Sequence, residues 1–181
     1  MLDTNVFNRI LDGKASLELF GEYIIPYATH VQRDELEKTP DEKKREALLQ
    51  IFHAAITSSV ETESFALDIS RLDEAKLSED RMIPTSSFIW DVSKWGECTW
   101  SGAESLCSTL KAELDSLKVN PNNAQDALIA DTAIRGRYVL VTDDVNLTKV
   151  TKKHGGTCLS VKELGAQSLL QIKGGNDGTK R

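Results

Sequence analysis

Short apolar stretches alternate with amphipathic helical patterns along most of this 181-residue chain. The clearest apolar stretch, residues 138–142 (YVLVT), lies between helical patterns at residues 124–136 and 145–156. Strands separated by helices favour a parallel sheet, because a right-handed helical crossover brings each strand back in the same direction. We therefore expect an α/β fold with one domain, in which a parallel central β-sheet is flanked by helices in an α/β/α sandwich.

Apolar periodicity and turn residues predict the remaining elements. Thr29 is the expected N-cap of one helix, and Thr39 followed by Pro40 is the expected start of the next. Further helices are predicted at residues 4–13, 15–20, 30–39, 101–118 and 162–167, and strands at residues 1–2, 23–29, 64–69 and 157–161.

The domain is expected to span residues 1–166, followed by a polar, flexible C-terminal tail at 167–181. Residues 70–100 contain three tryptophans five positions apart, a spacing that fits neither a strand nor one helix face. We interpret this stretch as an insertion, which could pack locally under a loop or form a flap.

The net charge of −6 argues against a nucleic-acid binder that relies on overall basicity. No apolar stretch approaches the ~20 residues of a membrane helix, and Asp3 stands where a signal peptide would be basic. The three cysteines are an odd number without the spacing of a zinc site or a disulfide framework. We therefore expect a cytoplasmic protein with reduced, mostly buried thiols.

Acidic residues follow the predicted strands. Asp3 comes after the first strand, and Asp143 and Asp144 come after YVLVT. Glu35 and Asp126 lie in helices that could begin near the same edge, where functional groups of parallel sheets collect. Each acid alone also fits a local role as a helix cap, a first-turn residue or an exposed helix residue.

Several carboxylates at one edge would be unstable without a cation. Two carboxylates ~4 Å apart repel by about 4 kcal/mol at an effective dielectric of about 20, and each raises the pKa of the other. Mg²⁺ and Mn²⁺ prefer oxygen ligands, and either ion can activate a water and stabilise charge on a phosphate. The acids therefore predict a divalent metal site.

Four segments in order resemble the PIN-domain ribonucleases, a family that includes the VapC-like toxins of toxin–antitoxin modules. The segments are LDTNVF (2–7), THVQRDELEKT (29–39), QDALIADTAI (125–134) and LVTDDVNL (140–147). The resemblance implies a PIN-like nuclease domain over residues 1–166 and a Mg²⁺- or Mn²⁺-dependent endoribonuclease. It makes the catalytic residues Asp3, Glu35, Asp126 and Asp144, with the metal held by Asp3, Asp126 and Asp144.

The family pattern at the last segment is Thr-any-Asp, which makes Asp144 the fourth acid and Asp143 the variable position. Asn5 and Thr142 would orient the acids, and Asn146 matches a further polar position of the family. A metal-activated water would attack the phosphodiester in line, without a covalent enzyme intermediate.

The same resemblance implies an RNA substrate, a small antitoxin partner and a homodimer as candidate partners, and no membrane. Basic residues gather just after the last segment, at Lys149, Lys152 and Lys153, and are candidates for RNA binding. For the helix predicted at residues 145–156, Asp143 or Thr142 is the expected N-cap. We expect Asp131 on the solvent side of its helix.

Three other functions stay open on sequence alone. One is a catalytically silent PIN-like module that binds RNA or protein, and another is a structure-specific DNA nuclease of the same fold. A phosphatase of the haloacid-dehalogenase type would use Asp3 as its nucleophile, but it would want a second Asp where Asn5 stands.

Overall fold

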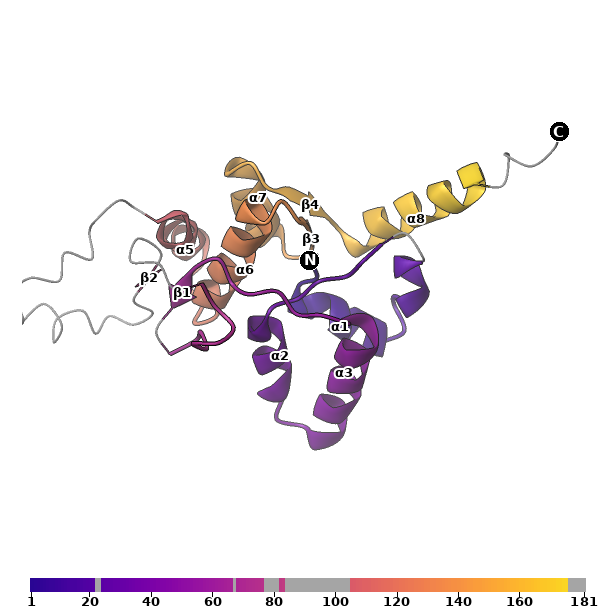
Figure 1. Cartoon of the computed structure of the whole chain (residues 1–181), viewed down its shortest axis with the longest axis horizontal. Helices are drawn as coiled ribbons and strands as arrows, with labels where there is room; N and C mark the ends of the chain where they lie inside the picture. The colour runs from indigo at the N-terminus through magenta and orange to yellow at the C-terminus, as the bar shows by residue number, and fades with distance from the viewer. Residues whose placement is uncertain (22–23, 67, 77–81, 84–104, 176–181) are drawn as a thin grey trace, which may run out of the picture.

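The computed structural model describes residues 1–21, 24–66, 68–76, 82–83 and 105–175 (Figure 1). Within these residues seven α-helices and one 3₁₀-helix surround short parallel strands. In chain order the helices are α1 (Thr4–Leu11), η1 (Leu17–Phe20), α2 (His30–Glu37), α3 (Glu42–Ala55), α5 (Leu106–Leu117), α6 (Asn123–Arg135), α7 (Val145–Lys153) and α8 (Val161–Gly175).

The strands form two parallel pairs. Strand β3 (Val139–Val141) pairs with β4 (Thr157–Leu159), and β1 (Phe65–Ala66) pairs with β2 (Met82–Ile83). Leu2 adds a single parallel bridge to Val141 on the other side of β3. The predicted mixed α/β class is confirmed, whereas the described residues do not form the full parallel-sheet sandwich that the sequence suggested.

Residues 24–29 lie beside the start of the chain without forming the predicted strand. The amide of Leu2 donates to the carbonyl of Tyr27 at 2.8 Å, and the amide of Val60 donates to Ala28 at 2.9 Å. Pro26 interrupts this segment, and a proline has no N–H to donate to a ladder. Residues 24–29 are therefore joined to Leu2 and to Val60 by single hydrogen bonds instead of a strand ladder.

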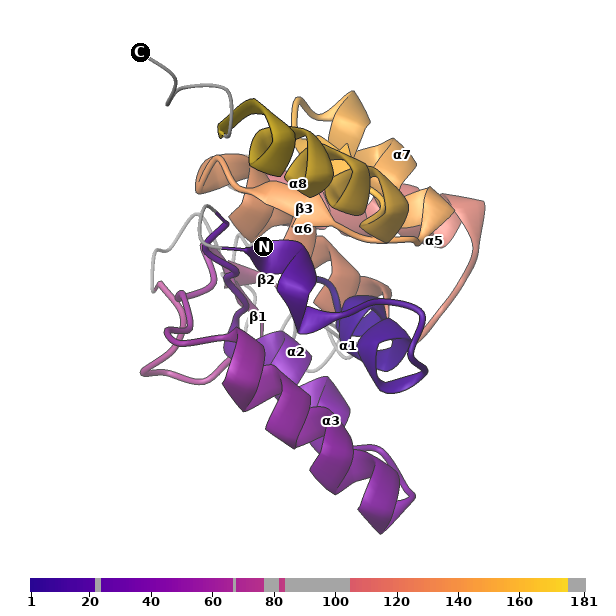
Figure 2. The same cartoon turned by 90° about the vertical axis from the view of Figure 1, so that its right-hand side faces the viewer.

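Apolar side chains pack on both faces of the strands. Leu140 and Cys158 belong to a core shared with α5, α6 and α7. Leu2 and Val141 belong to a second core that includes residues of α1, α3 and α8. Figures 1 and 2 show the corresponding arrangement, with α5–α7 on one side of β3 and α1–α3 on the other. This division follows from the alternation of side chains along a strand.

The helix starts confirm one predicted cap and correct another. Thr29 caps α2 in a capping box with Gln32, as predicted. The predicted start of α3 at Thr39 and Pro40 is wrong, because the N-cap is Asp41. The Asp41 side chain accepts the amide of Lys44 at 2.9 Å, so the helix begins at Glu42.

Asp131 lies inside the protein, so its predicted place on the solvent side of α6 is wrong. Its carboxylate accepts hydrogen bonds from the hydroxyl of Ser64 and from Nε of Arg135, both at 2.8 Å. Arg135 lies one helical turn further along α6, and this ion pair offsets the cost of burying the charge.

Four further predictions concern the end of the domain, the tryptophan segment, the cysteines and the absence of a membrane helix. Helix α8 continues past residue 166, where we ended the domain, to Gly175. The tryptophans of segment 70–100 lie outside the described residues. Cys107 and Cys158 are buried free thiols, as predicted. Across the described residues, no helix has both the length and the apolarity of a membrane span.

Leu140 provides a test of the core. Leu140 is fully buried at the centre of β3, whereas the adjacent Val139 is 40% exposed. Leu140→Ala should lower the free energy of unfolding by about 2–5 kcal/mol, and Val139→Ala should lower it by less than about 1 kcal/mol. Chemical denaturation of both variants measures the difference, and equal losses would contradict this assignment of the strand faces.

Candidate functional site

Asp3 is fixed at the point where the start of the chain meets β3. Its amide donates to the carbonyl of Val141 at 3.0 Å. Its Oδ2 accepts from the hydroxyl of Thr142 at 2.6 Å and from Nδ2 of Asn5 at 2.5 Å. Its Oδ1 accepts the amide of Thr4 at 2.7 Å, which makes Asp3 the N-cap of α1. Asn5 and Thr142 therefore contact the acid that the resemblance expects them to orient.

Glu35 approaches the same place from α2. Its Oε2 accepts the hydroxyl of Thr4 at 2.5 Å, and its Oε1 accepts Nδ2 of Asn122 at 3.1 Å. Thr4 directly follows Asp3, and Asn122 lies at the start of the helix that carries Asp126. Glu35 is thus held between the segments that carry two other predicted acids.

Asp126 has a more strongly raised pKa than Asp3. Burial raises its pKa to about 8, helped by the charges of Asp3, Glu35 and Asp144. Its carboxylate has no hydrogen bond or ion pair among the described residues. Burial removes water from the charged form and the three neighbouring carboxylates repel it, so this acid binds its proton more tightly.

The pKa of Asp3 is raised to about 6, mainly because this carboxyl is buried. The charges of Glu35 and Asp144 raise it further, whereas the hydrogen bonds from Thr142 and Thr4 lower it. The four acids predicted from sequence are therefore close enough to act on one another electrostatically, although they come from four separate segments.

Asp144 and its neighbour Asp143 have different surroundings. Asp144 is the N-cap of α7 and accepts the amide of Leu147 at 2.8 Å, so the cap predicted at Asp143 or Thr142 is one residue or more too early. Thr142 instead accepts the amide of Asp144 at 3.0 Å through its hydroxyl.

The side chain of Asp143 has partners outside the group of four acids. It forms an ion pair with Arg9 of α1 and accepts the amide of Val161, at the start of α8, at 3.3 Å. This pairing makes Asp143 a link between α1 and α8. Asp143 is also neutralised by a cation, and this distinguishes it from the four clustered acids.

None of the four clustered acids forms a salt bridge with any described residue. Acids elsewhere in the described chain do pair, such as Asp131 with Arg135, Asp143 with Arg9 and Glu113 with Lys153. As the side chains stand, no three His, Cys, Asp or Glu residues of the described part are grouped so as to hold a metal ion. Asp3 and Asp144 each accept a backbone amide of the helix that they cap.

The remaining predicted residues lie along α7. Asn146 is partly buried and Lys149 is exposed. Lys152 is exposed as well, whereas Lys153 donates to Glu113 of α5 at 2.8 Å. Of the three predicted RNA-binding lysines, Lys153 is therefore engaged within the protein.

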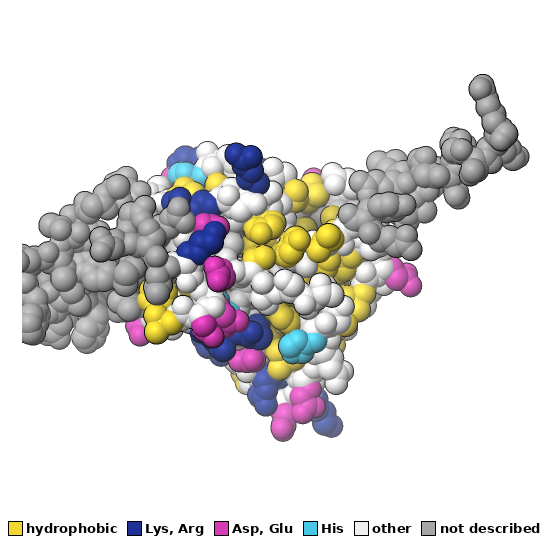
Figure 3. Space-filling view, in the orientation of Figure 1, with side chains coloured by type: hydrophobic (Ala, Val, Ile, Leu, Met, Phe, Trp, Pro, Cys, Tyr) yellow, Lys and Arg dark blue, Asp and Glu magenta, His cyan; other side chains and the backbone are white. Residues whose placement is uncertain are grey.

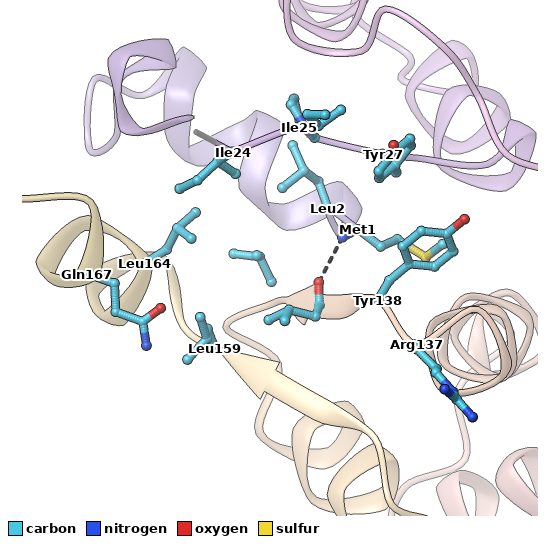
Figure 4. A pocket seen from close by; sticks show the side chains of 13 residues that line it. Met1, Leu2, Ile24, Ile25, Tyr27, Arg137, Tyr138, Leu159, Leu164 and Gln167 are labelled. Atoms are coloured by element: carbon cyan, nitrogen blue, oxygen red, sulfur yellow. Dashed lines mark hydrogen bonds between the residues drawn. The ribbon is translucent and has the colours of Figure 1, made fainter. Parts of the chain in front are cut away.

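A separate apolar slot of about 340 Å³ lies between residues 24–27, the start of the chain and strands β3 and β4 (Figure 4). Tyr27 and Tyr138 both line it and pack against each other with tilted rings, their centroids 5.2 Å apart. None of the four acids lines this slot. Figure 3 shows hydrophobic side chains gathered in the middle of the face where the start of the chain meets β3.

Sequence reasoning missed three residues at or beside the acids. Thr4 and Asn122 hold Glu35, and Arg9 neutralises Asp143. Asn122 and Glu35 are 87 residues apart in sequence, so no local pattern predicts their contact. Thr4 did carry a signal, because it lies between Asp3 and Asn5 in a segment already singled out.

Similarity to known proteins does not identify this group of acids. No protein-family model matches the chain, and no curated protein is significantly similar to it.

The raised pKa of Asp126 gives a stability test in buffer with a chelator. The folded protein keeps this proton up to about pH 8, whereas an unfolded Asp loses it near pH 3.8. The folded state therefore binds more protons across this window, and stability falls as pH rises through it. Asp126→Asn removes this contribution, so its Tm should fall less than that of the wild type between pH 5 and pH 8.5.

The expected difference in Tm at pH 8.5 is at least about 2 °C in favour of the variant. Thermal unfolding followed by circular dichroism at several pH values measures it. Asp143→Asn is the matched control, because Asp143 is paired with Arg9. Parallel Tm curves for the wild type and Asp126→Asn would contradict the electrostatic coupling.

Proposed function

We propose that this protein is a PIN-like, Mg²⁺- or Mn²⁺-dependent endoribonuclease that acts in the cytoplasm. One observation carries the proposal: four carboxylates from four segments lie close together, and no described residue forms a salt bridge with any of them. Burial, with the charges of the neighbouring acids, raises the pKa of Asp3 and of Asp126. The order of the four segments that resemble the PIN-domain ribonucleases supports the same function. The described parallel strand pairs are compatible with that fold but form only part of its sheet.

The four acids fit a hard divalent cation in ligand type and in charge. Asp3, Asp126 and Asp144 would hold the ion, with Glu35 as a further ligand directly or through a water. The side chains need rotamer changes to converge, since Asp3 and Asp144 now accept backbone amides. The bound ion would supply an activated water and stabilise the charge that develops on the phosphate.

The protein's own groups have distinct parts in this scheme. Thr142 and Asn5 hold the Asp3 carboxylate in one orientation, and the buried surroundings strengthen its interaction with a positive charge. Asp126 must lose its proton when a cation binds, so binding should release a proton at neutral pH. Hydrolysis needs no nucleophilic side chain.

The proposed substrate is single-stranded or looped RNA. Lys149 and Lys152 of α7 are exposed on the helix that begins at Asp144, where they could contact phosphates. A role as the toxin of a toxin–antitoxin pair, with a small antitoxin that covers the acids and with a homodimeric assembly, belongs to the same proposal. A catalytically silent module and a structure-specific DNA nuclease are the alternatives that the following assay separates.

Asp144→Asn should reduce Mg²⁺- or Mn²⁺-dependent cleavage of single-stranded RNA by at least about 100-fold, because it removes a charge from the cation site. Asn caps helices about as well as Asp, so the start of α7 should persist. Asp143→Asn should keep most of the activity, since Asp143 pairs with Arg9 outside the cluster.

Initial rates on a fluorescent RNA, with a DNA of the same sequence in parallel, measure these effects. The absence of cleavage by the wild type with either ion would support the silent module. Preferential cleavage of branched DNA would support the DNA nuclease. A larger loss in Asp143→Asn than in Asp144→Asn would contradict the assignment of the fourth acid.

A further inference from the structure

Asn122 lies between the Glu35 carboxylate and the first turn of the helix that carries Asp126. Its backbone carbonyl accepts the amide of Asp126 at 3.0 Å. Its side-chain Nδ2 donates to Oε1 of Glu35 at 3.1 Å. One residue thereby connects the helix that carries Asp126 to the helix that carries Glu35.

The side chain of Asn122 does not serve its own helix. Asn is among the residues preferred at an N-cap, where the side chain accepts an amide of the first turn and typically adds ~1 kcal/mol. Asn122 occupies the N-cap position of α6 without making that hydrogen bond. Its backbone amide donates to Oδ1 of Asn120 at 3.1 Å, which fixes the turn before the helix. The side chain is thus directed toward Glu35 by a turn that holds its backbone.

Both described donors to Glu35 are neutral. Thr4 donates its hydroxyl to one carboxylate oxygen and Asn122 donates its amide to the other. A lysine or arginine here would fix the carboxylate equally well, but it would cancel the charge and repel a divalent cation. Neutral donors hold Glu35 in place and leave its negative charge available.

The donors also complete a continuous chain of contacts. Asp3 accepts the amide of Thr4, Thr4 donates to Glu35, Glu35 accepts from Asn122, and Asn122 accepts the amide of Asp126. Thr4 therefore links Asp3 to the Glu35 carboxylate, and Asn122 links that carboxylate to the first turn of the helix that carries Asp126. Without Asn122, Glu35 would be held from one side only.

We infer that Asn122 is a positioning residue that fixes the Glu35 carboxylate beside the other acids and thereby sets the affinity for a divalent cation. The inference rests on the proposed function for the identity of the ligand. Asn122 acts through Glu35 and is not itself a ligand. Partners that orient metal ligands in this way typically change metal affinity by about 10–100-fold when removed.

The test is Asn122→Ser in the full chain, with Mn²⁺ binding measured by isothermal titration calorimetry in the absence of RNA. Serine is as good an N-cap as asparagine, but its side chain is shorter and ends in a hydroxyl. The Kd for Mn²⁺ should rise by about tenfold. The Tm without Mn²⁺ should stay equal, because the Asn122 side chain makes no capping hydrogen bond that the substitution would remove, and a purely structural role for Asn122 would lower it.

Asn120→Ala is the matched control, since Asn120 stabilises the same turn without contacting an acid. It should leave the Kd for Mn²⁺ within about twofold of the wild type. A Kd that rises as much in Asn120→Ala as in Asn122→Ser would overturn the inference, because the turn as a whole would then matter.

Asp126→Asn separates this inference from the proposed function. If Asp126→Asn loses Mn²⁺ binding while Asn122→Ser binds as tightly as the wild type, the inference is overturned and the proposed function stands. If the wild type binds no Mn²⁺ at millimolar concentration, the inference and the proposed function are both overturned.

Discussion

The contact between the first three residues and β3 determines where the acids of this protein meet. Asp3 and Thr142 are 139 positions apart in sequence, yet the amide of Asp3 bonds to Val141 and its carboxylate bonds to the Thr142 hydroxyl. This pairing fixes the start of α1 relative to the start of α7. Glu35 then joins the group through Thr4, which directly follows Asp3, and through Asn122 at the start of the helix that carries Asp126.

Sequence reasoning succeeded where the signal was local. Thr29 and its capping box, the helix patterns and the apolar stretch before Thr142 all depend on neighbours within a few residues, and the structure contains these elements. Sequence reasoning failed where the environment of a residue depends on partners far away in the chain. Asp131 is buried because Ser64 and Arg135 satisfy its charge, and no pattern around residue 131 reveals the contribution of Ser64.

The candidate site shows the same division. The positions of the four acids follow from strand ends and from the resemblance, whereas the residues that hold them are visible only in three dimensions. The two adjacent aspartates after β3 illustrate the limit. Their sequence context is nearly identical, but Arg9 neutralises Asp143 while Asp144 stays uncompensated beside Asp3 and Asp126. Charge compensation, rather than position along the chain, distinguishes structural acids from candidate ligands in this fold.

The bond between Lys153 and Glu113 has a consequence for how salt affects binding. This bond ties α7 to α5 and pairs the Lys153 charge with a carboxylate, whereas Lys149 and Lys152 on the same helix are exposed. Single-stranded nucleic acid releases counterions in proportion to the phosphates that a protein neutralises. Few such contacts release few ions, so RNA would bind this acidic protein with a shallow dependence on ionic strength. Under the proposed function, the cation rather than a basic surface would be the main attraction for a phosphate.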